Sequence, residues 1–225
     1  MRLSFFDLRT PSRTATRFAV LILLGQALAC HAGRPLSVED AGVNDPGEGH
    51  LEAWIAAVEG SGTSLNLAPA WSPGKGVELS ASFARSPDRD DGAASAQFKL
   101  QLSPPVPAGC HQAAIGGIGW SRAASGASPY VNAVSSCDTS WGALHLNLGA
   151  RRAPADGWLP TWGVALERPI GAQVAHIEAI GARHEKPTFQ AGVRRELDRY
   201  WQLDGTIGHS NRSTVFSIGF KRSFR

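Results

Sequence analysis

Two residues of the chain have the types that could bind a metal ion from one side of a strand. His176 and Glu178 stand two positions apart, so in an extended strand both side chains point to the same face. A protein zinc site needs at least three protein ligands, and the spacing of this pair fixes no third one. The chain also has no phosphate-binding loop or dinucleotide fingerprint. We therefore expect His176 and Glu178 to be two polar residues on one face of a strand and not a metal site. We also expect no cofactor.

A second string, Gly208-His209-Ser210-Asn211, contains the residue types of a hydrolase. A serine hydrolase needs its serine and histidine within hydrogen-bonding reach of each other. In an outer-membrane lipid hydrolase both would have to lie on the surface that faces lipid. Adjacent residues of a strand point to opposite faces, which would separate His209 from Ser210. The chain also lacks a Gly-x-Ser-x-Gly nucleophile turn. The sequence predicts that the protein is not an enzyme, with a lipid hydrolase as the less favoured alternative.

Most of the chain after residue 49 alternates between apolar and polar residues, which is the period of a β-strand with one apolar face. Turn residues divide this region into twelve predicted strands, near 50–60, 63–71, 76–86, 93–103, 111–121, 130–137, 141–152, 159–168, 173–184, 188–197, 200–210 and 213–224. Most of them approach the roughly 9–11 residues with which a tilted strand crosses a bilayer, whereas strands of soluble proteins average about 5–6.

These strands predict an all-β fold, a closed antiparallel transmembrane β-barrel. Ten strands is the alternative, because the patterns of 50–60 and 130–137 are the weakest. The longer connections at 86–92 and 121–129 would lie at one end of the barrel, and shorter turns such as 72–75 at the other. Bacterial outer-membrane barrels show this asymmetry and keep both termini on the periplasmic side.

The N-terminal region has the pattern of an export signal. Four arginines precede a short apolar run at 18–24 that ends in small residues, so residues 1–32 are predicted to be a cleaved signal peptide. Cleavage before Cys30, with a lipidated cysteine, stays open as the less favoured site. The whole chain has 22 basic and 19 acidic residues; without the four arginines and Asp7 there are 18 of each. A mature protein without excess positive charge is not expected to bind nucleic acid.

Residues 33–49 lack apolar periodicity and contain Pro35 and Pro46, so we interpret them as an extended periplasmic lead-in to a barrel of residues 50–225. Once Cys30 is removed, Cys110 and Cys137 are the two cysteines of the chain. They stand at the base of one predicted hairpin, and exported cysteine pairs usually form disulfides. We predict a Cys110–Cys137 disulfide.

The polar positions of the predicted strands define the face that would line the barrel. Buried charges must be paired or hydrated. A packed polar interior that makes the barrel rigid is slightly favoured over a charged lining along a solute path. The predicted lumen-facing polar residues are Glu52, Glu78, Lys99, His145, Glu167, His176, Glu178, Arg194, Glu196, Asp204 and Lys221.

Three regions of the chain resemble a known protein family. Directly after the predicted signal peptide, Arg34-Pro35-Leu36-Ser37-Val38-Glu39-Asp40-Ala41-Gly42 resembles small proteobacterial outer-membrane β-barrels. Asn66-Leu67-Ala68-Pro69-Ala70 with Gly76-Val77-Glu78-Leu79 is similar to that family's second and third strands. Leu203-Asp204-Gly205-Thr206-Ile207-Gly208 with Phe216-Ser217-Ile218-Gly219-Phe220 is similar to its last two.

Members of this family are described as transporters, and some are grouped with phenol-degradation-pathway outer-membrane proteins. The resemblance implies a barrel in the outer membrane of a Gram-negative bacterium, with outer-membrane lipid around it and a small-molecule solute as a further partner. It supplies no catalytic motif. A structural or adhesive barrel stays open as another class.

The C-terminal strand resembles the assembly signal of outer-membrane barrels through Gly219, Phe220 and Phe224, which implies the barrel-assembly machinery as a partner. Arg222 departs from that signal, because it stands where an apolar residue is usual.

Overall fold

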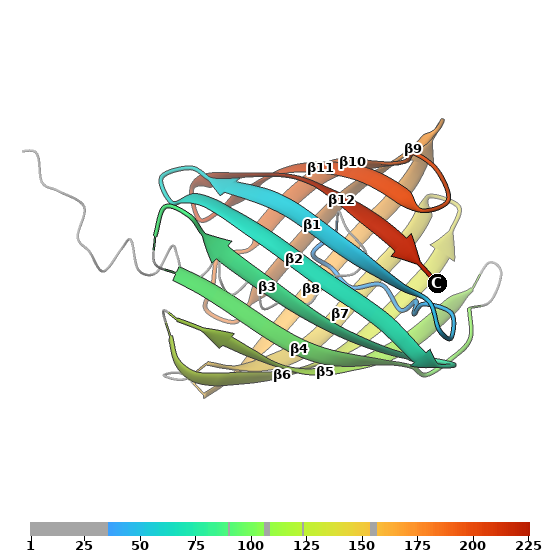
Figure 1. The fold of residues 1–225 in the computed structure, drawn as a ribbon, viewed down its shortest axis with the longest axis horizontal. Coiled ribbons are helices and arrows are strands. Elements are labelled where there is room, and N and C mark those ends of the chain that lie inside the picture. Colours follow the sequence, from blue (N-terminus) through green and yellow to red (C-terminus); the bar gives the residue numbers. More distant parts are fainter. Residues whose placement is uncertain (1–35, 90, 106–108, 123, 154–156) are drawn as a thin grey trace, which may run out of the picture.

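The computed structural model describes residues 36–225 except 90, 106–108, 123 and 154–156. Twelve antiparallel strands form one closed barrel (Figure 1), which confirms the predicted fold class and rules out the ten-strand alternative. The strands are β1 Gly49–Val58, β2 Gly62–Gly74, β3 Val77–Ser86, β4 Asp91–Gln101, β5 Cys110–Ser121, β6 Ala124–Thr139, β7 Gly142–Ala153, β8 Gly157–Ile170, β9 Gln173–Ala182, β10 Thr188–Glu196, β11 Trp201–Ser210 and β12 Ser213–Phe224.

Each strand pairs with its sequence neighbours, and the last strand closes the sheet on the first. The β1–β12 register runs from Gly49 opposite Phe224 to Val58 opposite Val215. Closing the sheet satisfies the backbone hydrogen bonds that an edge strand would leave unpaired. The end of the barrel that holds Gly49 and Phe224 is called the C-terminal end below.

The two faces of the wall follow the alternation of the sequence, with the polar face inside. Large apolar side chains on the outer face are exposed, as for Leu148 at 69% and Ile177 at 60%. Inward-facing polar side chains are buried and bond to each other across strands, as in the Ser82–Ser95 hydroxyl pair at 2.7 Å. This inverted distribution is that of a barrel whose outer face meets lipid.

One predicted loop is wrong. Residues 121–129 carry serine, glycine and proline, which indicated a long connection, yet β6 already begins at Ala124. Pro129 pairs with Ile118, and the register shifts at Trp120 and Ser121. Positions 125 and 126 of β6 lie between these paired positions, and an irregularity of this kind keeps small polar residues in a strand. The connection from β3 to β4 is also short, because β4 begins at Asp91.

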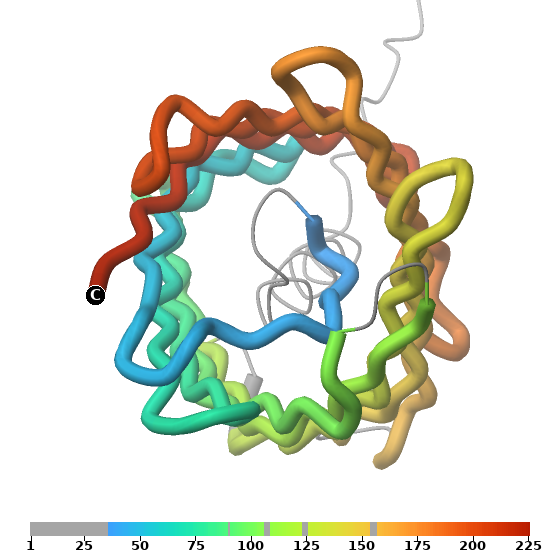
Figure 2. Tube along the Cα trace, turned by 90° about the vertical axis from the view of Figure 1, so that its right-hand side faces the viewer, coloured from blue at the N-terminus to red at the C-terminus, as the bar shows by residue number. Residues whose placement is uncertain are grey.

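The most important difference from the sequence-based interpretation concerns the residues before β1. Residues 36–48, called the luminal segment below, contain no strand before Gly49 and run inside the barrel (Figure 2). The sequence pattern of residues 33–49 indicated only an extended periplasmic lead-in. Its partners on the inner wall, described below, explain why the described part of it lies in the lumen.

The Cys110–Cys137 disulfide is present, as predicted. The two residues are directly opposite each other in the β5–β6 register, with 4.0 Å between their Cα atoms. This separation lies within the roughly 7 Å limit for a bridged pair.

Within the described part of the chain, no helix has the length and apolar character needed to cross a membrane.

Candidate functional site: the barrel lumen

The inner wall contains most of the polar residues that the sequence assigned to the lumen. Their side chains are almost fully buried at Glu52, Glu78, Lys99, His145, Glu167, His176, Glu178 and Asp204. Arg194 and Lys221 are partly buried, and Glu196 is exposed at the end of β10. The wall therefore brings together residues from strands that are far apart in the sequence.

One group of these residues joins β6, β7, β8 and β10. Arg194 donates to Glu167 with 2.6 Å between Nη1 and Oε1. The other oxygen of Glu167 lies 3.5 Å from Nε2 of His145, whose Nδ1 is 2.8 Å from the Ser136 hydroxyl. These contacts link four strands through polar side chains on the inner wall, where buried charges need partners of opposite charge.

The luminal segment is held to the wall mainly through its own backbone. The N–H groups of Ser37 and Val38 both donate to Oε2 of Glu178 on β9, at 2.8 and 2.9 Å. Gln190 on β10 donates to the Ser37 hydroxyl at 2.9 Å. A carboxylate that receives two backbone N–H bonds holds the chain more strongly than a neutral acceptor would.

Asn147 on β7 makes a paired contact with the next residue of the segment. Its side-chain oxygen accepts from the Glu39 N–H, and its side-chain amide donates to the Glu39 carbonyl, both at 2.8 Å. The Ala41 N–H donates to the Ser136 hydroxyl, also at 2.8 Å. These side chains take the place of a neighbouring strand, which the luminal segment does not have.

The side chain of Glu39 is paired with Lys99 on β4. The distance between Nζ and Oε2 is 2.8 Å, and Lys99 also donates to the Asp40 carbonyl at 3.2 Å. Nearer to β1, the backbone and side-chain N–H groups of Asn44 both donate to Glu78 on β3. The segment is thus bonded to β3, β4, β6, β7, β9 and β10.

Apolar contacts also hold the luminal segment against the inner wall. Leu36 and Val38 are buried with Ala165 of β8, and Ile180 packs against this cluster. A Cβ atom placed on Gly163 would come within 3.0 Å of a Val38 methyl group. Glycine at 163 therefore leaves the space that Val38 occupies.

The geometry does not support the metal site or the serine hydrolase that the sequence analysis considered. Among the described residues, no group of three His, Cys, Asp or Glu side chains could hold a metal ion. His176 and Glu178 lie on the inner wall. His209 is exposed on the outer face, whereas Ser210 is buried and accepts a hydrogen bond from Thr188 at 2.8 Å, so the two are on opposite faces.

Sequence reasoning missed the partners of the luminal segment. Asn147, Ser136 and Gln190 are uncharged and so were passed over when the charged lumen residues were selected. They occupy inward positions of the same alternation, which could have identified them as lumen-facing. Leu36 and Val38 were the available signal on the segment itself, since an exposed lead-in has no need of apolar residues.

Several solved structures have a similar fold, among them two porins and an outer-membrane protein. The structure described as "KdgM porin in complex with disordered oligogalacturonate" has a TM-score of 0.61 at 12% identity, over 79% of this chain and 99% of that one. A NanC porin structure has a TM-score of 0.62 at 9% identity, over 76% and 98% of the two chains. Omp33, an outer-membrane protein of Acinetobacter baumannii, has a TM-score of 0.56 at 8% identity, over 79% and 98%.

These identities are low, so the likeness concerns the fold. A comparison with curated proteins finds no match. The match to a family covers residues 19–216, which is most of the chain. The chain belongs to the family described as "uncharacterised conserved protein UCP029691".

Proposed function

We propose that the protein is an outer-membrane channel for passive movement of a small solute. The observation that carries this proposal is the closed barrel with an apolar outer face and a polar, charged lumen. An apolar outer face requires lipid around it, and a polar lumen lowers the cost of moving a polar solute across that lipid. The porin descriptions of KdgM and NanC support the same reading.

The charge of the lumen favours a neutral or cationic solute. Among the described residues, the inner wall and the luminal segment hold the buried carboxylates of Glu39, Glu52, Glu78, Glu167, Glu178 and Asp204, against the cations of Lys99, Arg194 and Lys221. Such an excess of carboxylates repels anions. Oligogalacturonate, named with KdgM, is a polyanion, so we propose a different solute class here. Phenol-type aromatic compounds are neutral near pH 7 and fit both the lumen charge and the resemblance to phenol-degradation outer-membrane proteins.

The luminal segment narrows the path. Beside it, a cavity lined by His50, Glu52 and Glu78 has a volume of only about 10 Å³, close to the space of one water molecule. The hydrogen bonds of the segment to six strands hold it across the lumen, where it would obstruct a solute. We propose that residues 36–48 act as an occluding element that leaves the lumen when the channel conducts.

A second candidate is a structural barrel whose interior is filled. The same hydrogen bonds from Glu178, Asn147 and Lys99 favour it, because they hold the segment in place from several strands. In either case we propose a non-enzymatic protein that is exported with residues 1–32 as its signal peptide. The C-terminal strand, with Gly219, Phe220 and Phe224, would be recognised by the barrel-assembly machinery.

Liposome swelling distinguishes the two candidates and the solute class. Refolded protein in liposomes is exposed to a neutral sugar, a uronate and an amino sugar of similar size, with protein-free liposomes as the control. We expect swelling with the neutral and cationic solutes and slower swelling with the uronate. The Lys99→Met variant, which loses one of the lumen cations, should discriminate more strongly against the uronate. No swelling with any solute would favour the structural barrel.

A further inference from the structure

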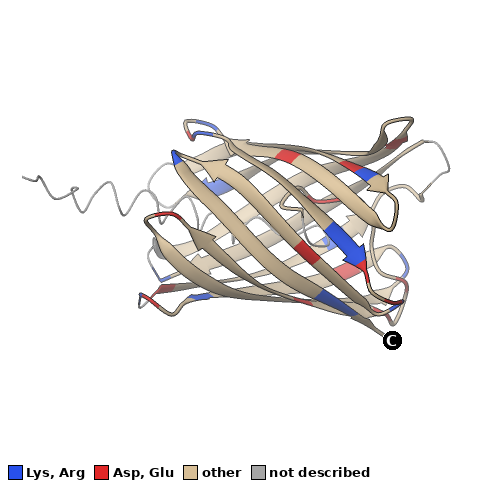
Figure 3. Cartoon of the chain, turned by 90° about the horizontal axis from the view of Figure 1, so that it is seen from above, with Lys and Arg blue, Asp and Glu red and all other residues tan. Residues whose placement is uncertain are grey.

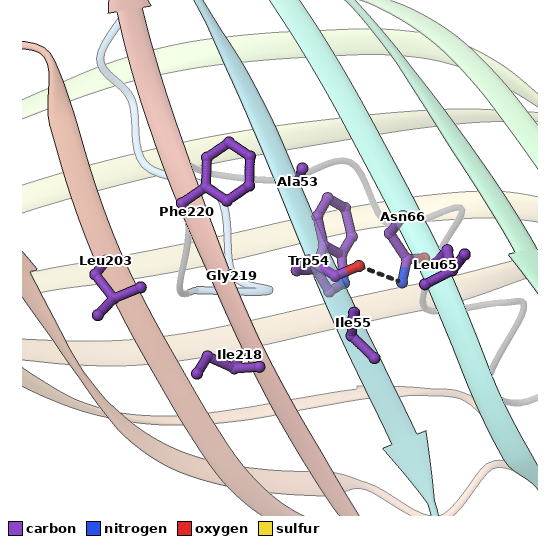
Figure 4. Close-up of a pocket in the computed structure, with 9 residues that line it drawn as sticks. All are labelled: Ala53, Trp54, Ile55, Leu65, Asn66, Leu203, Ile218, Gly219 and Phe220. Atoms are coloured by element: carbon purple, nitrogen blue, oxygen red, sulfur yellow. Dashed lines mark hydrogen bonds between the residues drawn. The ribbon is translucent and has the colours of Figure 1, made fainter.

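The outer wall contains a groove within the apolar face. It has a volume of about 380 Å³ and lies over β1, β2, β11 and β12 (Figure 4). Volumes of about 300–1,000 Å³ are usual for small-ligand sites. Its lining includes Ile55, Leu203, Ile218 and Phe220, each between 39% and 48% exposed. Ala53 lies directly between Phe220 and Leu67 in the register, and its short side chain creates the depression.

Arginines lie next to this groove, on the side of the C-terminal end. On β12, Arg222 is exposed two residues beyond Phe220 and therefore points to the same outer face. On β10, exposed Arg195 is directly opposite Leu203 of the groove. Basic residues in these last strands are visible toward the C-terminal end in Figure 3. Both arginines lie near the ends of their strands, where an outward arginine costs little and its guanidinium can reach lipid headgroups.

Trp201 connects the arginine to the groove. It is opposite Arg222 in the β11–β12 register, and the Arg222 guanidinium lies 5.3 Å from the centre of the Trp201 ring. The Trp201 ring in turn lies 5.6 Å from the ring of Phe220, which lines the groove. An aromatic ring in this place is typical of the interface between acyl chains and headgroups. The apolar groove, the aromatic rings and the arginines thus follow one another toward the C-terminal end.

We propose that this surface binds one glycerophospholipid of the leaflet at the C-terminal end of the barrel. An acyl chain lies in the groove beside Ala53, and the phosphate is bound by Arg222 and Arg195. Arginine suits this ligand because its planar guanidinium can donate two hydrogen bonds to a phosphate. The site also explains why Arg222 stands where outer-membrane assembly signals usually have an apolar residue. It rests on the membrane location proposed above and is independent of solute transport.

Native mass spectrometry of the full mature chain, purified in detergent with added phosphatidylglycerol, tests the site. We expect one retained lipid on the wild type. Arg222→Gln should weaken retention about fivefold, as for one lost arginine near a lipid surface, and Arg195→Gln with Arg222→Gln about 25-fold. Ala53→Phe, which fills the groove, should weaken it about tenfold by displacing about two methylene groups.

Arg168→Gln is the matched control, because Arg168 is an exposed outward arginine near the same end of β8 but away from the groove. It should retain lipid as the wild type does. Arg222→Lys should retain more lipid than Arg222→Gln, which separates loss of charge from misfolding.

Equal retention by all variants would overturn the proposal, since it would mean a non-specific lipid shell. Unchanged retention by Ala53→Phe alone, or displacement of the lipid by inorganic phosphate, would mean a phosphate site without an acyl groove and would also overturn it. A wild type that carries neither detergent nor lipid would contradict the membrane location itself.

Discussion

Lys99 of β4 and Glu39 of the luminal segment form an ion pair inside the barrel, with 2.8 Å between Nζ and Oε2 and 3% of each side chain exposed. Removing one partner of a buried ion pair leaves an uncompensated charge, which costs more than the intact pair contributes. The pair therefore influences whether residues 36–48 stay in the lumen.

Lys99→Met should release the luminal segment. The buried Glu39 side chain would lose the cation that pairs with it, and leaving the lumen would relieve the cost of burying a carboxyl group without that partner. Hydrogen exchange of the Glu39 and Ala41 amides should become faster, as measured by mass spectrometry. The double variant Glu39→Gln, Lys99→Met should exchange more slowly than Lys99→Met alone. Unchanged protection in Lys99→Met would contradict this role of the pair.

Glu178→Leu should free the start of the segment. It removes the acceptor of the Ser37 and Val38 N–H groups, and an unsatisfied buried donor costs about 1–3 kcal/mol. Glu178→Gln, which keeps one side-chain oxygen, should have a smaller effect. Amide exchange at these two residues is the measurement, and exchange at Asn44, which bonds to Glu78 instead, is the internal reference. Exchange in Glu178→Leu that equals the wild type would show that Glu178 is not the anchor.

Loss of the Cys110–Cys137 disulfide should lower stability without opening the barrel. Its cysteines are 27 residues apart, and the chain-entropy estimate for such a loop is roughly 3–4 kcal/mol. Cys110→Ser with Cys137→Ser should lower the urea midpoint of unfolding, followed by tryptophan fluorescence. The wild type under reducing conditions should match the variant. A wild-type midpoint that reduction leaves unchanged would argue against the bond.

The β1–β2 turn offers a test by pH. Glu59 accepts hydrogen bonds from the backbone N–H and the hydroxyl of Thr214, and these bonds lower the pKa of the Glu59 carboxyl below its ordinary value of 4.5. With a lowered folded-state pKa, the contact contributes above the ordinary value and is lost as the pH falls through the folded-state pKa. Thr214→Val should raise the pKa of Glu59, as read by NMR titration. The same titration curve in both proteins would contradict the contact.

The barrel wall was largely predictable because strand alternation is a local property. Phe216, Ile218 and Phe220 alternate with smaller or polar residues, and the structure places these three on the outer face. The cysteine pair was predictable for a similar reason, since a hairpin brings its two bases together. The error at 121–129 came from serine and glycine, which are compatible with both a loop and a bulged strand.

The occupant of the lumen could not be predicted in the same way. Its anchors are distant in sequence: Val38 and Glu178 are 140 residues apart, and Glu39 and Asn147 are 108 apart. The segment uses side-chain acceptors rather than a strand register, so residues 36–48 carry no periodic signal. Only the assembled barrel shows that the polar inner face of the wall binds the backbone of residues 36–48.

Single-channel conductance in planar bilayers tests most directly whether the lumen is a path that residues 36–48 occlude. The mature chain is compared with a variant that lacks residues 33–44 and with Lys99→Met. We expect small or rare openings in the mature chain, larger and persistent ones in the deletion variant, and intermediate behaviour in Lys99→Met. A deletion variant that inserts but does not conduct, or that conducts no more than the intact chain, would contradict the occluded channel.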